Sequence, residues 1–252
     1  MKCAIMQPTY IPWLGYFDLI DQVDHFIFLD DVKLEKGSWH VRNRIKTGQG
    51  ELMLTLPIRK TKSSLEMLIL EAEINQQEKW KPKHLKSIQQ SYQKTAFFKE
   101  VFPFFEALLE SGPDTLSEFN IAIIKGISDR IGIRTQFHQS SRMRTREGVK
   151  EARLIDLCLE LGCAEYVSPP GSSAYINEES PGGKFIGSPV ALSYMSYVHP
   201  EYRQPSGDFL SHMGVIDLLF NAGFDKALEI IRSGRRPALG YLALSAAPAA
   251  GT

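Results

Sequence analysis

A histidine and a pair of aspartates are the residues in this sequence best suited to acid–base chemistry. His199 directly precedes Pro200 at the end of a strand-like run, and the position before a proline favours an extended backbone. Asp30 and Asp31 follow the apolar run HFIFL; adjacent side chains on an extended backbone point to opposite faces, so only one carboxylate can enter a given cleft. We predict that His199 is the catalytic general base and that Asp30 or Asp31 is a second catalytic residue, while the other aspartate caps or pairs. A hydrogen-bonding role that holds the loop is the alternative for His199.

The loop QPTYIPWLGYF is rich in aromatic residues, which are unusual in loops. Tyr10, Trp13 and Tyr16 need either a core to cover or a ligand to stack on. Gln7 ends an apolar strand-like run, where an unpaired amide group would be costly. We predict that these four residues bind substrate, with a plug over the end of the sheet as the structural alternative.

A basic segment, WHVRNRIK, follows the second apolar run. Its alternation places Arg42, Arg44 and Lys46 on one side of an extended backbone. Guanidinium groups match phosphate oxygens, so this side suits a diphosphate, whereas a charged edge strand is the alternative. We predict substrate binding by Trp39, Arg42, Asn43 and Lys46.

Two further loops supply polar groups. Ser168 opens the loop SPPGSS, whose backbone amides suit an oxyanion. After His199, the segment YRQPSGDF offers the hydroxyl, amide and aromatic groups of Tyr202, Gln204 and Phe209, while Asp217 and Asn221 lie one helical turn apart. The predicted substrate-binding residues of these segments are Ser168, Tyr202, Gln204 and Asn221.

The elements that must position these residues predict an α/β fold. An apolar strand over residues 2–7, the aromatic loop, a helix from Leu14 and the strand HFIF form a βαβ unit. This unit puts the aromatic loop at the carboxyl edge of a mostly parallel sheet, where α/β proteins bind ligands. We predict flanking helices, a hairpin turn at TGQGE, a helical lobe over about residues 75–133, and a single domain over residues 1–234. Residues 235–252 are rich in Ala, Gly and Pro and are predicted to be a disordered tail.

Composition and missing motifs make several classes of partner and cofactor less expected. Lys plus Arg and Asp plus Glu both number 29, so no net charge attracts nucleic acid. No apolar run reaches membrane-spanning length, and a cytoplasmic protein without membrane insertion is expected. Cys3, Cys158 and Cys163 form no CxxC pair and are predicted to be buried free thiols. No motif for a metal, nicotinamide cofactor, P-loop or serine nucleophile is present.

Several segments together resemble the WbqC-like family. They are MQPTYIPWLGYFDLIDQVDHFIFLDDV, WHVRNRIKT, KWKPKHLKSI, EYVSPPGSSAY, HPEYRQPSGDF and VIDLLFNAG, in order through about residue 224. The loop SPPGSS, where a glycine-richer sequence is typical, and His212 at a position where Ser is common depart from the family pattern. The positions that match are Gln7, Pro8, Tyr10, Pro12, Trp13, Gly15, Tyr16, Asp30, Asp31, Trp39, Arg42, Asn43, Lys46, His199, Tyr202, Gln204, Phe209, Asp217 and Asn221.

The resemblance implies a role in O-antigen and other surface-polysaccharide biosynthesis. It suggests a transferase that acts on a nucleotide-linked amino sugar, with N-acylation of the sugar amine as the expected reaction. No bound cofactor is expected; acyl-CoA or another activated acyl donor would be a co-substrate. The expected partners are the nucleotide sugar and, as one option, a second copy of the chain in a homodimer. The alternatives are a nucleotidyl- or glycosyltransferase and a non-catalytic nucleotide-sugar-binding protein. Nucleotidyl transfer is disfavoured because Trp13 and Tyr16 replace the two histidines of the HxGH motif, whose positive charge neither ring can supply.

Overall fold

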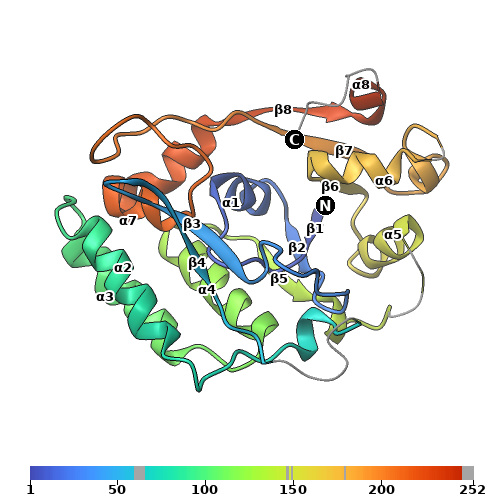
Figure 1. Cartoon of the computed structure of the whole chain (residues 1–252). Coiled ribbons are helices and arrows are strands. Elements are labelled where there is room, and N and C mark those ends of the chain that lie inside the picture. Colours follow the sequence, from blue (N-terminus) through green and yellow to red (C-terminus); the bar gives the residue numbers. More distant parts are fainter. Residues whose placement is uncertain (60–65, 146–147, 149, 179, 246–252) are drawn as a thin grey trace.

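The protein is described by a computed structural model that covers residues 1–59, 66–145, 148, 150–178 and 180–245 (Figure 1). The strands are β1 (Lys2–Met6), β2 (His25–Phe28), β3 (Arg42–Thr47), β4 (Gly50–Thr55), β5 (Gln136–Gln139), β6 (Glu165–Ser168), β7 (Ala191–Tyr197) and β8 (Arg235–Gly240). The helices are α1 (Leu14–Asp21), α2 (Trp80–Tyr92), α3 (Phe98–Ser111), α4 (Leu116–Arg130), α5 (Lys150–Glu160), α6 (Ser173–Ile176), α7 (Ile216–Ser233) and α8 (Tyr241–Ser245).

The central sheet confirms the predicted α/β class. Within the described residues it contains six strands in the order β5-β2-β1-β6-β7-β8. All neighbouring pairs are parallel except β7 and β8, which are antiparallel. From β1 the chain builds outward to β2 and β5 on one side and to β6 and β7 on the other. The point where the order reverses, at the carboxyl ends of β1 and β6, is where open α/β sheets bind ligands.

Alternating side chains of β1 bury both faces of this sheet. Ala4 belongs to a large apolar core with residues of α1, α4 and α7, whereas Cys3 and Ile5 belong to a second core with residues of α5. This period of two is the expected geometry of a strand covered on both sides. The three cysteines are free and buried, as predicted.

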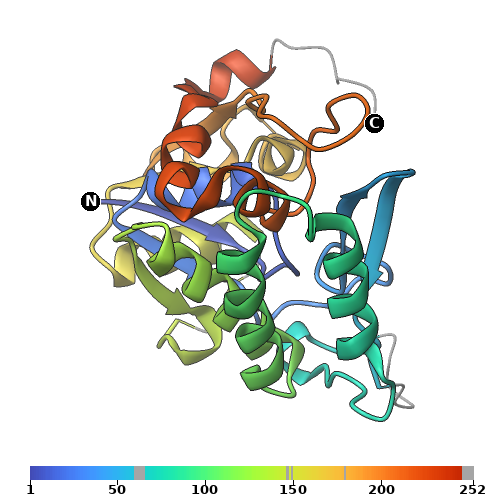
Figure 2. The same ribbon diagram turned by 90° about the vertical axis from the view of Figure 1, so that its left-hand side faces the viewer.

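The middle of the chain forms the predicted helical region. Helices α2, α3 and α4 lie side by side, and α2 packs against the hairpin formed by β3 and β4 (Figure 2). The strands of this hairpin are antiparallel and join through a tight turn between Thr47 and Gly50, where the motif TGQGE predicted it. The hairpin stands apart from the main sheet and brings its polar residues to the region above β1.

The prediction of a disordered tail is wrong for residues 235–245, which form β8 and α8; residues 246–252 lie outside the described part. Arg235 explains the order, because its guanidinium donates to the buried Asp18 of α1 at 2.9 Å and contacts Asp21 at 2.5 Å. Arg232 adds a further ion pair to Asp21 at 2.7 Å. Burial raises the pKa of Asp18 to about 6, and the charge of Arg235 opposes this shift. The tail is therefore anchored by charges that lie more than 200 residues away in sequence.

None of the helices in the described part is long and apolar enough to span a bilayer.

Candidate functional site

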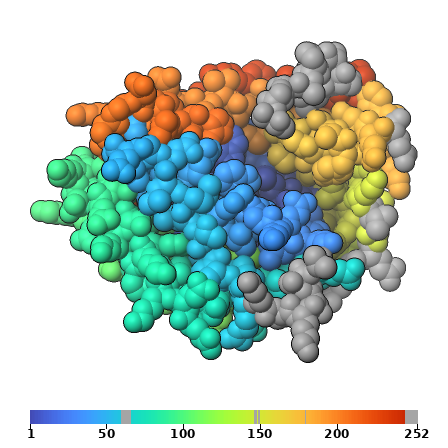
Figure 3. All heavy atoms as spheres, in the orientation of Figure 1, coloured from blue at the N-terminus to red at the C-terminus, as the bar shows by residue number. Residues whose placement is uncertain are grey.

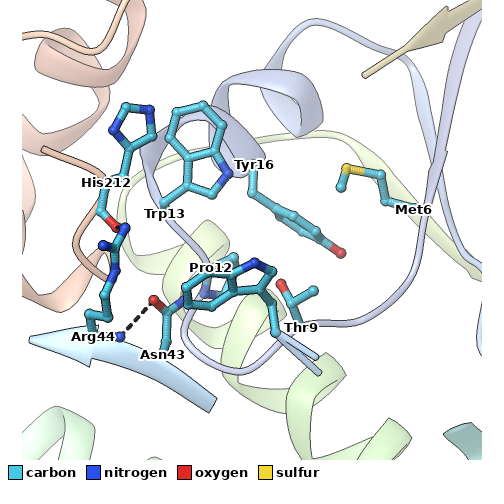
Figure 4. A pocket seen from close by; sticks show the side chains of 9 residues that line it. Met6, Thr9, Pro12, Trp13, Tyr16, Asn43, Arg44 and His212 are labelled. Carbon is cyan, nitrogen blue, oxygen red and sulfur yellow. Dashed lines mark hydrogen bonds between the residues drawn. The ribbon is translucent and has the colours of Figure 1, made fainter. Parts of the chain in front are cut away.

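A cavity of about 350 Å³ opens at the carboxyl end of β1. Its walls come from the aromatic loop, the hairpin strand β3 and the loop before α7, which adjoin one another on the surface (Figures 3 and 4). The lining residues are Met6, Thr9, Pro12, Trp13, Tyr16, Trp39, Asn43, Arg44 and His212. Three segments that are distant in sequence therefore converge at the ligand-binding edge that the strand order predicts.

Trp13 forms one wall because the residue two positions later is a glycine. A Cβ atom on Gly15 would lie 2.2 to 2.6 Å from carbons of the Trp13 indole ring, so only glycine allows the ring to fold over the first turn of α1. The same indole contacts the edge of Tyr197 and the imidazoles of His199 and His212. The ring is thus held on several sides while it still lines the cavity (Figure 4).

Asn43 holds the aromatic loop in position. Its buried amide donates to the carbonyl oxygens of Tyr10 and Ile11 at 3.0 and 2.8 Å and accepts from the backbone of Arg44 at 2.8 Å. Ile11 has a φ of 45°, a strained value for a β-branched residue. The two hydrogen bonds donated by the Asn43 side chain stabilise this unusual turn. Asn43 therefore shapes the cavity, and both N–H groups of its side chain already have partners.

Arg44 connects the hairpin to the loop before α7. Its guanidinium donates to both carboxylate oxygens of Glu51 at 3.0 Å and to the carbonyl of His212 at 3.3 Å. It also lies 5.4 Å from the ring centre of Trp39, which is 48% exposed. This geometry favours a cation–π contact that orients the indole of Trp39 at the cavity rim.

Two imidazoles adjoin Trp13, but only that of His212 lines the cavity. The ring centres of His212 and Trp13 are 4.8 Å apart (Figure 4). Those of His212 and His199 are 4.9 Å apart. His212 has a left-handed backbone with a φ of 59°, which directs this side chain toward the rim. Partial desolvation and the charge of Arg44 lower the pKa of His212, so its imidazole is neutral at pH 7.

His199 lies behind Trp13, and its tautomer follows from one contact. Nδ1 is 2.9 Å from the carbonyl oxygen of Pro200; a carbonyl only accepts, so Nδ1 carries the proton and Nε2 is an acceptor. Nε2 is buried without a protein partner. Burial lowers the pKa of His199 to about 4, although the bond to Pro200 opposes the shift. His199 is therefore a neutral ring stacked at 15° to Trp13.

Comparison with known proteins supports the resemblance seen in the sequence. The profile of the WbqC-like protein family matches residues 7–229. The chain belongs to the WbqC-like protein family. A curated relative, the uncharacterized protein Rv1507c of Mycobacterium tuberculosis, is 34% identical over 224 residues, which cover 88% of this chain and 94% of that protein. No solved structure matches the chain at a significant level.

The aspartate pair of this WbqC-like protein does not line the cavity. The carboxylate of Asp30, 2% exposed, accepts hydrogen bonds from the hydroxyls of Ser140 and Ser141 at 3.1 and 2.8 Å and from the backbone of Ser141 at 3.0 Å. Asp31 accepts from Ser140 at 2.6 Å and forms an ion pair with Arg153. Both carboxylates therefore tie the end of β2 to the segment after β5. Among the described residues, no hydrogen bond joins either aspartate to His199, whose Nδ1 bonds to the carbonyl oxygen of Pro200.

Lys46, Tyr202 and Gln204 also turn inward. The ammonium group of Lys46, 4% exposed, donates to the side chain of Gln204 at 3.1 Å and to the carbonyl of Asp208. Tyr202 and Gln204 donate to the buried carboxylate of Asp217 at 2.8 and 2.7 Å. These residues hold the segment between β7 and α7 against the hairpin. None of the three is among the described residues that line the cavity.

The remaining predicted residues divide between the cavity and the core. Trp13, Tyr16, Trp39 and Asn43 line the cavity. The others do not: Tyr10 is fully buried against His84 and Phe119, Gln7 accepts from the Tyr16 hydroxyl through its backbone, Arg42 lies beside Gly37, Ser168 is buried next to Tyr166, and Asn221 donates to the backbone of Asp217.

Sequence reasoning missed His212 as a cavity residue. Its immediate neighbours, Ser211 and Met213, form no catalytic motif, and the left-handed turn that directs it to the rim is not encoded by a glycine or asparagine. The signal that was available is the departure from the family pattern at this position. Among the described residues, no group of three or more His, Cys, Asp or Glu side chains is arranged to hold a metal ion.

The close contact between the Trp13 indole and Gly15 predicts the effect of a substitution at Gly15. Gly15→Ala is expected to displace the indole, because the new Cβ would lie within 2.6 Å of its ring. The near-UV circular dichroism and tryptophan emission should change, while the free energy of unfolding stays within about 1 kcal/mol because alanine favours a helix over glycine. Gly171→Ala, which meets nothing within 4 Å, is the matched control. Spectra identical to those of the wild type would show that Gly15 does not position Trp13.

Proposed function

We propose that this WbqC-like protein is a transferase of surface-polysaccharide biosynthesis that N-acylates an amino sugar carried on a nucleotide. The observation that carries the proposal is the imidazole of His212 on the rim of an aromatic cavity at the carboxyl edge of β1. The family's resemblance to transferases of O-antigen pathways supports the substrate class. The cavity, although formed partly by residues other than those predicted, lies where the βαβ unit predicts a ligand.

The chemistry requires a neutral amine near a base. His212 is neutral at pH 7 because its pKa is lowered, and Nδ1 lies 2.8 Å from the hydroxyl of Ser211. When Nδ1 donates to that hydroxyl, Nε2 carries a free lone pair. The amine attacks the carbonyl carbon of an acyl thioester, a C–N bond forms and the C–S bond breaks. His212 takes the proton from the amine and returns it to the leaving thiolate.

The imidazole of His199 lies next to that of the proposed base, His212. Its ring is stacked on Trp13 and lies 4.9 Å from His212 between ring centres, and a second positive imidazole there would be repelled. The neighbouring imidazole of His212 is one of the causes that lower the pKa of His199, after desolvation by burial. Asp30 and Asp31 have no role in this step, because their carboxylates are hydrogen-bonded between β2 and the segment after β5.

Product analysis tests the reaction. The protein is incubated with acyl-CoA and dTDP- or UDP-linked amino sugars, chosen first by the rise in melting temperature that a ligand of the folded state produces. Mass spectrometry is expected to show a nucleotide sugar heavier by one acyl group, with one equivalent of free thiol. Release of pyrophosphate would indicate nucleotidyl transfer, and the absence of any acylated product across the panel would overturn the proposal.

Non-catalytic binding of a nucleotide sugar is the second candidate. It is favoured by the buried position of His199 Nε2 and by the internal hydrogen bonds of the aspartate pair, since these groups were the expected catalytic residues. This candidate predicts a raised melting temperature with a nucleotide sugar and no turnover with any acyl donor.

A further inference from the structure

The polar groups that face the cavity are mostly hydrogen-bond donors. The side-chain amide of Asn43 and the hydroxyl of Tyr16 already donate hydrogen bonds to backbone carbonyl oxygens. None of the hydrogen bonds found among the described residues involves the indole N–H of Trp13 or Trp39, both of which line the cavity. The Nε atom of Arg44 is buried and unpaired. Indole and guanidinium groups donate but do not accept. No carboxylate is among the residues that line this cavity in the described part of the chain.

This lining suits a particular kind of ligand. The hydroxyls of a sugar need acceptors as well as donors, and each buried hydroxyl left unpaired would weaken binding roughly five- to 150-fold. The lining side chains that can accept are the hydroxyl oxygens of Thr9 and Tyr16 and the imidazole of His212. An acyl group has an apolar chain and one carbonyl oxygen that only accepts. Its chain would contact Met6, Pro12 and the aromatic walls, and its oxygen would face the donors.

We infer that the cavity is the subsite for the acyl group of the donor, with the amino sugar at the rim beside His212. This inference rests on the proposed acyl transfer and names the part of the donor that the cavity binds. An apolar cavity of roughly 150 Å³ holds a benzene ring. The present cavity, about 350 Å³, therefore accommodates a chain of roughly 6 to 12 carbon atoms.

A series of small thioesters tests the inference directly. Acyl N-acetylcysteamine thioesters with chains from acetyl to dodecanoyl are titrated against the full chain, with tryptophan fluorescence and calorimetry as readouts. The dissociation constant is expected to fall about fourfold for each added CH₂ group and to level off when the cavity is full. A dissociation constant that does not depend on chain length would overturn the inference.

A variant at the rim locates the bound chain. Trp39 is 48% exposed, so Trp39→Ala is expected to fold; it should weaken binding of the octanoyl thioester about tenfold, as befits the loss of a large aromatic contact. Leu159→Ala, at a 43% exposed apolar residue of α5 that does not line the cavity, is the matched control and should change binding less than twofold. Equal binding of the octanoyl thioester by wild type and Trp39→Ala would place the chain elsewhere and overturn the inference.

The outcome can be separated from that of the proposed function. The titrations contain no amine acceptor, so they report acyl binding without transfer. Binding that depends on chain length, with no acylated product in the transfer assay, would uphold the acyl subsite and reject the reaction. Transfer of an acyl group with binding independent of chain length would uphold the reaction and reject this subsite.

Discussion

Asp217→Ala is expected to lower the free energy of unfolding by about 3–5 kcal/mol, the cost of breaking a buried charged cluster by removing one partner. Asp217 is fully buried on α7 and accepts hydrogen bonds from Tyr92 at 2.7 Å, Tyr202 at 2.8 Å and Gln204 at 2.7 Å. The nearby residue Lys46 is 4% exposed. Alanine would leave all three donors unpaired and the charge of Lys46 without its nearest compensation.

Urea denaturation with two control variants checks this prediction. Asp225→Ala, on an exposed face of the same helix, should change stability by less than about 0.5 kcal/mol. Asp217→Asn keeps the volume but sets an amide donor among other donors, and should cost about 1–3 kcal/mol. A loss below about 1 kcal/mol for Asp217→Ala would mean that solvent or rearranged side chains replace the carboxylate. The segment between β7 and α7 would then not depend on this cluster.

The same cluster shows why strand patterns were easier to predict than ligand contacts. Continuous apolar runs predicted β1, β2 and their parallel pairing, because burial of a strand on both faces is encoded in its own residues. Lys46 was predicted to bind substrate as part of a basic side of an extended segment that suits a diphosphate, and Gln204 as the amide of a polar segment after His199. They face each other across 158 positions of sequence instead, and no local pattern encodes such a pairing.

Tyr10 and Trp13 illustrate the same limit within one loop. Both were predicted to bind substrate, yet Tyr10 is fully buried against His84 whereas Trp13 lines the cavity. The difference depends on the turn at Ile11 and on the amide of Asn43, which lies 32 residues further along the chain. The sequence shows that Gly15 lies two residues after Trp13. It does not show that the indole ring lies over Gly15, which is why this position requires glycine. β8 was missed for a similar reason, since Arg235 finds its partners on α1.

His212→Asn is expected to lower the acyl-transfer rate about 100-fold, a typical loss when a general base is removed. Asparagine is a better replacement than alanine because it tolerates the left-handed backbone of this position, where φ is 59°. A change in rate can then be assigned to the lost imidazole. The lowered pKa of His212 sets the pH dependence. The rate should fall only as the imidazole gains a proton, so the acidic limb lies below the ordinary histidine pKa of about 6.5, and the rate is constant above it.

Rates measured from pH 4.5 to 9 with a saturating acyl donor separate this role from a purely structural one. In His212→Asn the acidic limb should disappear, whereas a residue that merely holds the loop would lower the rate and leave that limb in place. His199→Phe preserves a ring against Trp13 but removes Nε2, and should lower the rate less than about tenfold if His212 is the base. A 100-fold loss in His199→Phe, with near-normal rates in His212→Asn, would show that His199 is the base and His212 is not. Trp13 would then have to move so that substrate reaches the buried Nε2 of His199.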